Sequence, residues 1–235
     1  MRWSAPGPQA PDEFLARLRT EGERRYHDRH PFHVRMHAGR LDRAELRRWV
    51  ANRWYYQTRI PVKDALILAK SEDPAFRRVW VRRVIDQDGT ADGDGGLAQW
   101  LRLAEGVGLS PAALVAGEHV LPGVRFACDA YVDLVRQATL VEAVAASLTE
   151  WFAPRLLADR TLAWERHYPW VPADALGYFR SRVPRARRDA DDAVAFVVRH
   201  ADTSEAQDRC VAALVRKTEI LWHLLDCVAA GDTAE

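Results

Sequence analysis

The chain has 235 residues, of which 48% are hydrophobic and 29% charged, so we expect a folded core and not a disordered protein. Its 34 Lys and Arg residues nearly balance its 33 Asp and Glu residues, and this net charge of +1 disfavours a dedicated nucleic-acid-binding protein. No run of about 18 apolar residues is present to span a membrane, and the opening residues lack a signal-peptide segment. We therefore predict a cytoplasmic protein with no membrane partner.

Helical periodicity runs through nearly the whole chain, and no period-2 strand pattern or hairpin signal interrupts it. Capping signals at Asp42-Arg-Ala-Glu45 and Asp73-Pro74 mark two helix starts. Residues 88–96 form a Gly- and Asp-rich loop, and 161–172 are expected to form an aromatic loop. The predicted helices cover 11–29, a short segment to 39, a helix from Asp42 to a kink at Pro61, and 74–86, 97–107, 122–139, 141–159, 173–182, 185–201 and 204–228. This pattern predicts one all-α domain over 1–235, a single-domain helical bundle of about eight helices.

Several apolar stripes of these helices carry charged or polar residues where apolar ones are expected. Arg53 and Gln57 lie on the stripe of the helix that Asp42 opens, and Lys63 continues that face beyond Pro61. The same feature recurs elsewhere at Arg83 and Gln87, at Glu150, at the i, i+4 pair Tyr178 and Arg182, and at Lys217.

A buried charge without a partner costs several kcal/mol, so each inward cation should meet a counter-charge. One interpretation is that these long side chains reach the surface or pair with Asp and Glu. The other is that cations from separate helices line a common cavity that binds a small polyanion, and several carboxylates are the simplest match.

Four histidines, His27, His30, His33 and His37, crowd one segment, but Pro31 divides them and no Glu-x-x-His pair completes a di-iron site. We therefore predict no metal, and an acid–base role for His27 at a helix end. The loop at 88–96 does not have the spacing of an EF-hand. The three cysteines contain no Cys-x-x-Cys pair and are interpreted as helical core residues.

Several longer strings resemble the family of pyrroloquinoline quinone (PQQ) synthase, across about residues 14–226. They are Trp49-Val-Ala-Asn-Arg53-Trp-Tyr-Tyr-Gln57-Thr, Ile60-Pro-Val-Lys63-Asp, Val120-Leu-Pro-Gly-Val-Arg-Phe-Ala, Ser147-Leu-Thr-Glu150-Trp-Phe-Ala-Pro154, His167-Tyr-Pro-Trp170 and Tyr178-Phe-Arg-Ser-Arg182.

The resemblance implies a homodimer of a haem-oxygenase-like fold with seven to eight helices and with no metal or other cofactor. It implies the last step of PQQ formation, in which dioxygen oxidises a ring-closing bicyclic polycarboxylate precursor and hydrogen peroxide is formed. A small polycarboxylate or PQQ is then the partner, in agreement with the inward cations.

The resemblance also implies roles for individual positions. Tyr178 and Arg182 are similar to a pair near the oxygen-binding position, and His27 to a pocket histidine. The residues implied to hold carboxylates or quinone oxygens are Arg53, Lys63, Arg83, Arg160 and Lys217. Those implied to donate or accept hydrogen bonds in the same pocket are Gln57, Tyr131, Thr149 and Glu150.

The chain departs from the family at two positions. The family usually has His-Asp-Gly where this chain has Gln87-Asp-Gly, and a histidine where Leu157 stands. Glutamine forms hydrogen bonds but cannot carry a proton near neutral pH, and leucine does neither. Three functions therefore stay open: a PQQ-synthase-type oxidase, an oxidase for another polycarboxylate or quinone-like metabolite, and a binding protein that has lost the chemistry.

Overall fold

The computed structural model describes residues 7–231, and in this range the chain is all helix and loop. The first six residues, on which part of the signal-peptide prediction rests, lie outside the described range. In chain order the α-helices are α1 (Pro11–Arg25), α2 (Pro31–His37), α3 (Arg43–Ala69), α4 (Pro74–Asp88), α5 (Gly95–Gly106), α6 (Pro111–Ala116), α7 (Pro122–Gln137), α8 (Leu140–Ala146), α9 (Ala153–His167), α10 (Gly177–His200) and α11 (Ser204–Ala230). Three 3-10 turns join them: η1 (His27–Arg29), η2 (Ser147–Trp151) and η3 (Ala173–Leu176).

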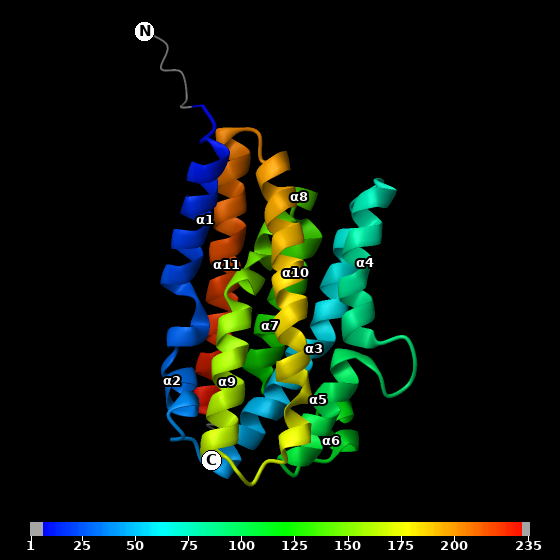
Figure 1. Ribbon diagram of the computed structural model, residues 1–235, viewed down its shortest axis with the longest axis vertical. Helices are drawn as coiled ribbons and strands as arrows, with labels where there is room; N and C mark the ends of the chain where they lie inside the picture. The colour runs from blue at the N-terminus through cyan, green and yellow to red at the C-terminus, as the bar shows by residue number, and fades with distance from the viewer. Residues whose placement is uncertain (1–6, 232–235) are drawn as a thin grey trace.

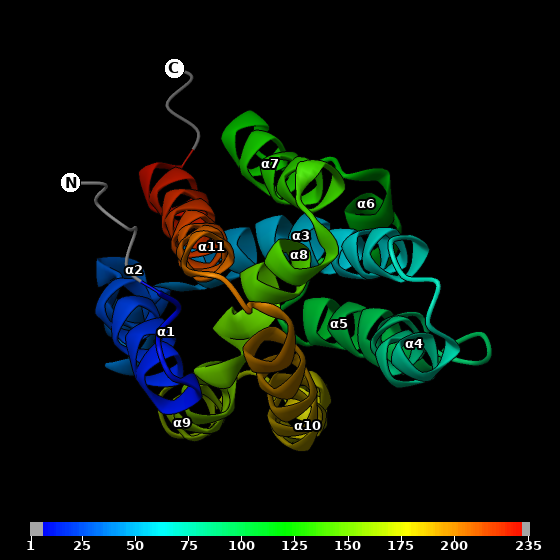
Figure 2. The same ribbon diagram turned by 90° about the horizontal axis from the view of Figure 1, so that it is seen from above.

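The helices form a bundle in which α1, α9, α10 and α11 run alongside one another (Figure 1). Seen from above, α8 lies near the middle, with α11, α3 and α10 around it (Figure 2). The buried indoles of Trp49, Trp100 and Trp164 pack together and against Phe179, with ring centroids 5.4 to 6.3 Å apart. No helix in residues 7–231 is both long enough and apolar enough for a membrane crossing.

The all-α prediction is confirmed, but residues 7–231 contain eleven α-helices where seven to eight were expected. The segment expected as one helix over 141–159 divides into α8, η2 and α9, and α6 starts unexpectedly where Ser110 caps a helix with proline at its first position. The expected aromatic loop at 161–172 is too long, because α9 continues to His167. The two helices expected around Pro184 are one, since α10 runs through that proline.

Pro61 also lies inside a continuous helix and does not end α3. A proline in a helix interior has no backbone N–H, so it leaves the carbonyl four residues earlier without its usual donor. In α3 that carbonyl belongs to Gln57. The side chain of Gln87 on α4 supplies the missing donor, with its Nε2 3.2 Å from the Gln57 carbonyl oxygen. The proline thus leaves the Gln57 carbonyl free to accept a hydrogen bond from α4.

Candidate active site

A partly enclosed cavity lies inside the bundle, lined mainly by residues of η1, α3, η2, α9 and α10. Its volume is about 70 Å³, room for a few water molecules and well below the roughly 300–1,000 Å³ usual for ligand pockets. The walls must therefore move outwards before a polycyclic molecule can enter. Its polar lining comprises Tyr26, His27, Arg53, Tyr56, Gln57, Thr149, Glu150, Arg160, Tyr178 and Arg182, and its apolar lining includes Ile60, Leu156, Leu157 and Leu221.

The residues selected from the sequence fall into two groups around this cavity. Eight of them line it: His27, Arg53, Gln57, Thr149, Glu150, Arg160, Tyr178 and Arg182. The other five, Lys63, Arg83, Gln87, Tyr131 and Lys217, are buried but lie behind the lining. All of the selected cations on the apolar stripes therefore point into the protein.

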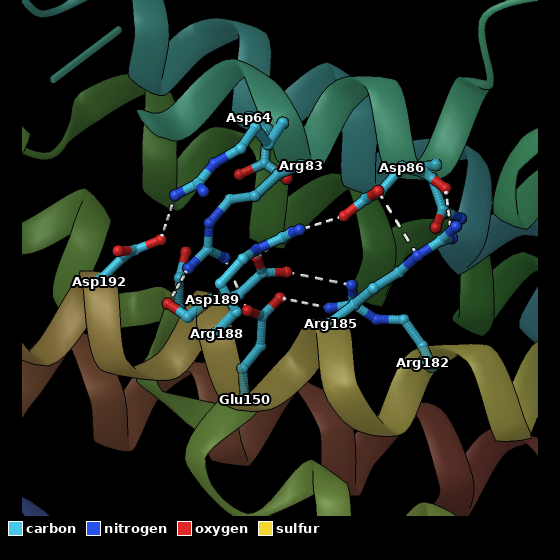
Figure 3. A network of polar contacts seen from close by, with 12 residues as sticks. Asp64, Arg83, Asp86, Glu150, Arg182, Arg185, Arg188, Asp189 and Asp192 are labelled. Atoms are coloured by element: carbon cyan, nitrogen blue, oxygen red, sulfur yellow. Dashed lines mark hydrogen bonds and ion pairs between the residues drawn. The ribbon is translucent and has the colours of Figure 1, made fainter. Parts of the chain in front are cut away.

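Two arginines are neutralised by carboxylates of the protein itself. Glu150 holds Arg83 with one oxygen at 2.6 Å and Arg182 with the other at 3.1 Å (Figure 3). Asp189 on α10 accepts from Arg182 at 3.1 Å, and its backbone oxygen accepts a hydrogen bond from Arg83. Burial opposes the charge of Arg83, but the carboxylates of Glu150 and Asp189 outweigh it and raise the pKa of Arg83. The positive charge of Arg83 is thus neutralised within the protein.

Lys63 is compensated in the same way. Its Nζ lies 2.6 Å from Oδ1 of the adjacent Asp64 and donates to Ser147 Oγ at 3.0 Å. Asp64 also accepts from the Trp80 indole at 2.9 Å. The lysine and its carboxylate are both buried, so the pair behaves as one neutral unit behind the cavity.

Three other cations have no carboxylate within ion-pair distance in residues 7–231. Arg53 lies over the ring of Tyr56 at 3.9 Å, and its buried Nη1 finds no hydrogen-bond partner in the described chain. Lys217 is fully buried, donates to Tyr56 Oη at 3.0 Å and lies 3.4 Å from the ring centre of Tyr131. Arg160 is 4% exposed and has an unpartnered Nε. Burying polar and charged atoms without partners costs free energy, unless a bound ligand supplies the missing partners.

The positive charge of Arg53 acts on both of the other two cations. Burial, and then the charge of Arg53, lower the pKa of Arg160 to about 9. Burial, and then Arg53, also lower the pKa of Lys217 far below its ordinary value. An anion placed among them would reverse the repulsion and raise both pKa values.

A hydrogen-bonded group of neutral side chains forms another part of the cavity wall. The Oε1 of Gln57 accepts two hydrogen bonds, from Tyr178 Oη at 2.7 Å and from Gln87 Nε2 at 3.1 Å. The hydroxyl proton of Tyr178 is thereby directed to Gln57, so its oxygen has only lone pairs left for other partners. Gln87 holds both the amide of Gln57 and its backbone carbonyl, and Leu157 adds an apolar wall.

His27 is the titratable group best placed to accept a proton. It is 3% exposed, lines the cavity, and its Nδ1 has no hydrogen-bond partner among the described residues. Burial, followed by the charges of Arg53 and Arg160, lowers its pKa well below the ordinary value, so the imidazole is neutral at pH 7.

The other histidines of the segment do not line the cavity. His30 turns away to Asp226, at 3.0 Å, and to Trp222. His33 contacts Arg160, which the sequence did not indicate. No group of three or more His, Cys, Asp or Glu in residues 7–231 is arranged to hold a metal ion. Cys128 and Cys210 are buried and Cys227 is half-buried.

No role was predicted from the sequence for Asp64, Asp189 or His33. Asp64 follows Lys63 directly, and that adjacency was a usable signal. Asp189 pairs with Arg182 seven residues away on α10, a helix expected to break at Pro184. His33 meets Arg160 across a helix pair, which periodicity within one helix does not reveal.

Comparison with known proteins identifies the family of the chain. The sequence profile of the TENA/THI-4/PQQC family matches residues 15–227. The chain belongs to this family. A pyrroloquinoline-quinone synthase of Cronobacter sakazakii is 47% identical over 225 residues, 96% of this chain and 89% of that one. One of Rhizobium rhizogenes is 48% identical over 218 residues, 93% of this chain and 88% of that one. The family recognised from the sequence strings is thereby confirmed.

Solved structures share the fold at low sequence identity. A domain from Shewanella denitrificans described as having a heme oxygenase-like fold superposes with a TM-score of 0.76 at 12% identity, covering 93% of this chain and 91% of that one. A TenA homologue from P. horikoshii superposes with a TM-score of 0.74 at 12% identity, covering 93% of this chain and 99% of that one. The fold is therefore haem-oxygenase-like.

Proposed function

We propose that this protein is an oxidase of PQQ formation. It closes a ring in a bicyclic polycarboxylate precursor and oxidises it to PQQ with dioxygen, without a metal or organic cofactor. The observation that supports this most is a set of three cations without a carboxylate partner among the described residues. Arg53 and Arg160 line the cavity, and Lys217 is buried behind its lining. A molecule with several carboxylates is what such a field stabilises. Homodimer formation and a cytoplasmic location belong to the same proposal.

The chemistry we assign to the site starts at His27. Its free Nδ1 accepts a proton from a substrate C–H bond, and the electron pair of that bond is retained in the substrate ring. The electron-rich ring passes two electrons to dioxygen. The oxygen takes up that proton and a second one from a substrate N–H or O–H group, and leaves as hydrogen peroxide. Arg53 and Arg160 stabilise the anions formed on the way.

We assign the binding of dioxygen to the part of the cavity wall that carries Tyr178 and Arg182. The family resemblance relates these two residues to the pair near the oxygen-binding position, and Arg182 is held by Glu150 and Asp189. In this chain the Tyr178 hydroxyl donates its hydrogen bond to Gln57, so its oxygen presents only lone pairs to other partners. A hydrogen-bond donor such as a hydroperoxide is therefore the species it would hold.

Mixing the purified protein with the bicyclic PQQ precursor in air tests the proposal. Growth of PQQ absorbance together with oxygen consumption is the expected result. Tight binding of the precursor without turnover would indicate a binding protein. No binding and no turnover would indicate that the cavity takes another polycarboxylate or quinone-like metabolite.

A further inference from the structure

His33 on α2 lies between the cavity and the helix that carries Arg160. Its side chain is 1% exposed, with Nδ1 3.0 Å from the backbone oxygen of His27 and Nε2 3.2 Å from a terminal nitrogen of Arg160. The edge of its ring faces Trp49, and His37 stacks on it at 6.1 Å between ring centres.

These two contacts allow only one protonation state of His33. A carbonyl oxygen cannot donate, so Nδ1 must carry the hydrogen that bonds to His27. A guanidinium has donors and no acceptor, so Nε2 must offer a lone pair to Arg160. His33 is therefore the neutral Nδ1–H tautomer. Burial, and then the charge of Arg160, lower the pKa of His33 well below its ordinary value, in agreement with this assignment.

The way Arg160 is held differs from the way Arg83 and Arg182 are held. Those two arginines are bound by the carboxylates of Glu150 and Asp189, which cancel their charge. Within the described residues, Arg160 has His33 as its hydrogen-bond acceptor and the ring of Trp49 at 4.9 Å beneath it. Neither neutralises the guanidinium.

We propose that His33 is a positioning residue that aims Arg160 into the cavity while leaving its positive charge free for an anionic ligand. The inference rests on the function proposed above, since it assigns the anchor of one of the cations that bind the substrate carboxylates. A neutral acceptor fixes the direction of the guanidinium, whereas a carboxylate in the same place would fix it and cancel its charge.

The same geometry gives the anchor a pH limit. Protonation of Nε2 would place a hydrogen against the guanidinium and break the contact. The charged and titratable groups that face His33 are Arg160 from α9, Arg53 from α3, His27 from η1 and His37 from its own helix. The two arginines repel a proton from His33, so the anchor stays in place at neutral pH and is lost only in acid.

Three substitutions separate positioning from bulk packing. His33→Gln keeps an acceptor near the Nε2 position, His33→Leu removes it, and His33→Glu keeps it but adds a negative charge. With PQQ as the probe in a fluorescence titration, we expect affinity within about threefold of wild type for His33→Gln, and a loss of about tenfold or more for the other two. His33→Leu in an Arg160→Gln background should cost no further affinity.

Two outcomes would overturn the inference: His33→Glu binding PQQ as well as His33→Gln, or the double variant losing affinity additively. Long-range ¹H–¹⁵N spectra of the histidine rings in the ligand-free protein, with His33 assigned by its loss in His33→Gln, supply a readout independent of the ligand. The neutral Nδ1–H pattern at pH 7 is expected, and an Nε2–H or charged ring contradicts the inference. If wild type does not bind PQQ but the ring pattern is as expected, the proposed function fails and the anchoring of Arg160 stands.

Discussion

Gln87 on α4 donates a hydrogen bond to the backbone carbonyl of Gln57 on α3, the carbonyl that Pro61 leaves without a helical donor. The same amide nitrogen lies 3.1 Å from Gln57 Oε1, which also accepts from Tyr178. One side chain thus compensates for a helix-interior proline and orients two residues of the cavity wall.

Replacing Gln87 tests this double role. Gln87→Leu leaves a buried carbonyl and a buried amide oxygen short of a donor, so we expect the free energy of unfolding to fall by about 1–3 kcal/mol and kcat to fall with it. Gln87→His restores a donor and adds a group that titrates near neutral pH, so its kcat should exceed that of wild type. Urea unfolding and oxygen-electrode assays measure both. A His variant no faster than wild type would mean that proton transfer has been rebuilt around Gln87.

Replacing Lys63 and replacing Lys217 should change the stability of the protein in opposite directions. Lys217→Met removes an uncompensated buried cation, so we expect the protein to gain about 1 kcal/mol or more of stability and to lose about tenfold or more of its PQQ affinity. Arg53→Ala should likewise weaken PQQ binding more than folding.

Lys63→Met is the matched control. It leaves the carboxylate of Asp64 buried without its partner, so about 3–5 kcal/mol of stability should be lost. Equal stability changes in the two lysine variants, or unchanged PQQ affinity in Lys217→Met or Arg53→Ala, would contradict the division between compensated and free cations.

Ligand binding should take up protons. In the free protein the pKa of Lys217 is lowered first by burial and then by Arg53. A bound polyanion next to Arg53 offsets that repulsion, so protons enter the site with it. Calorimetric titration of PQQ in buffers of different ionisation enthalpy measures the number taken up near pH 7, and Lys217→Met should lower it. Proton release on binding would be inconsistent with this charge arrangement.

Acid should destabilise the protein through its buried histidines. Burial is the first cause that lowers the pKa of His27, His33 and His37, the last to about 4. Between that value and the ordinary pKa near 6.5, the unfolded chain binds protons that the folded chain refuses, so stability rises with pH in this window and falls as pH drops through it.

Each such histidine contributes up to about 1.4 kcal/mol per pH unit to the slope of the free energy of unfolding against pH. Urea unfolding at pH 7, 5.5 and 4.5 measures the total, and His33→Gln should reduce it by about one histidine's share. A stability that is flat over this range would show that the three rings bind protons as easily when folded.

The sequence predicted the inward cations because a charge on an apolar stripe is visible in one helix. It also led to the expectation that each would meet a counter-charge. Within residues 7–231 this holds for Lys63, Arg83 and Arg182, and not for Arg53 and Lys217. Which carboxylate a buried cation meets depends on how the helices pack against one another. Asp189 reaches Arg182 along α10, a helix that the sequence analysis had divided at Pro184.

Helix boundaries were the weaker part of the prediction for a related reason. Proline signals a helix start when its missing N–H falls in the first turn, as at Pro111 in α6. At Pro61 the helix continues, and there the side chain of Gln87 takes the freed carbonyl. Such tertiary compensation has no signature within the segment itself.

A crystal structure of the protein with PQQ bound tests the central claim most directly. We predict PQQ in the cavity between α3, α9 and α10, with its carboxylates on the guanidinium groups of Arg53 and Arg160, and with Arg83 and Lys63 still paired with Glu150 and Asp64. PQQ bound elsewhere on the molecule, or bound in the cavity with its carboxylates away from Arg53 and Arg160, would contradict the account.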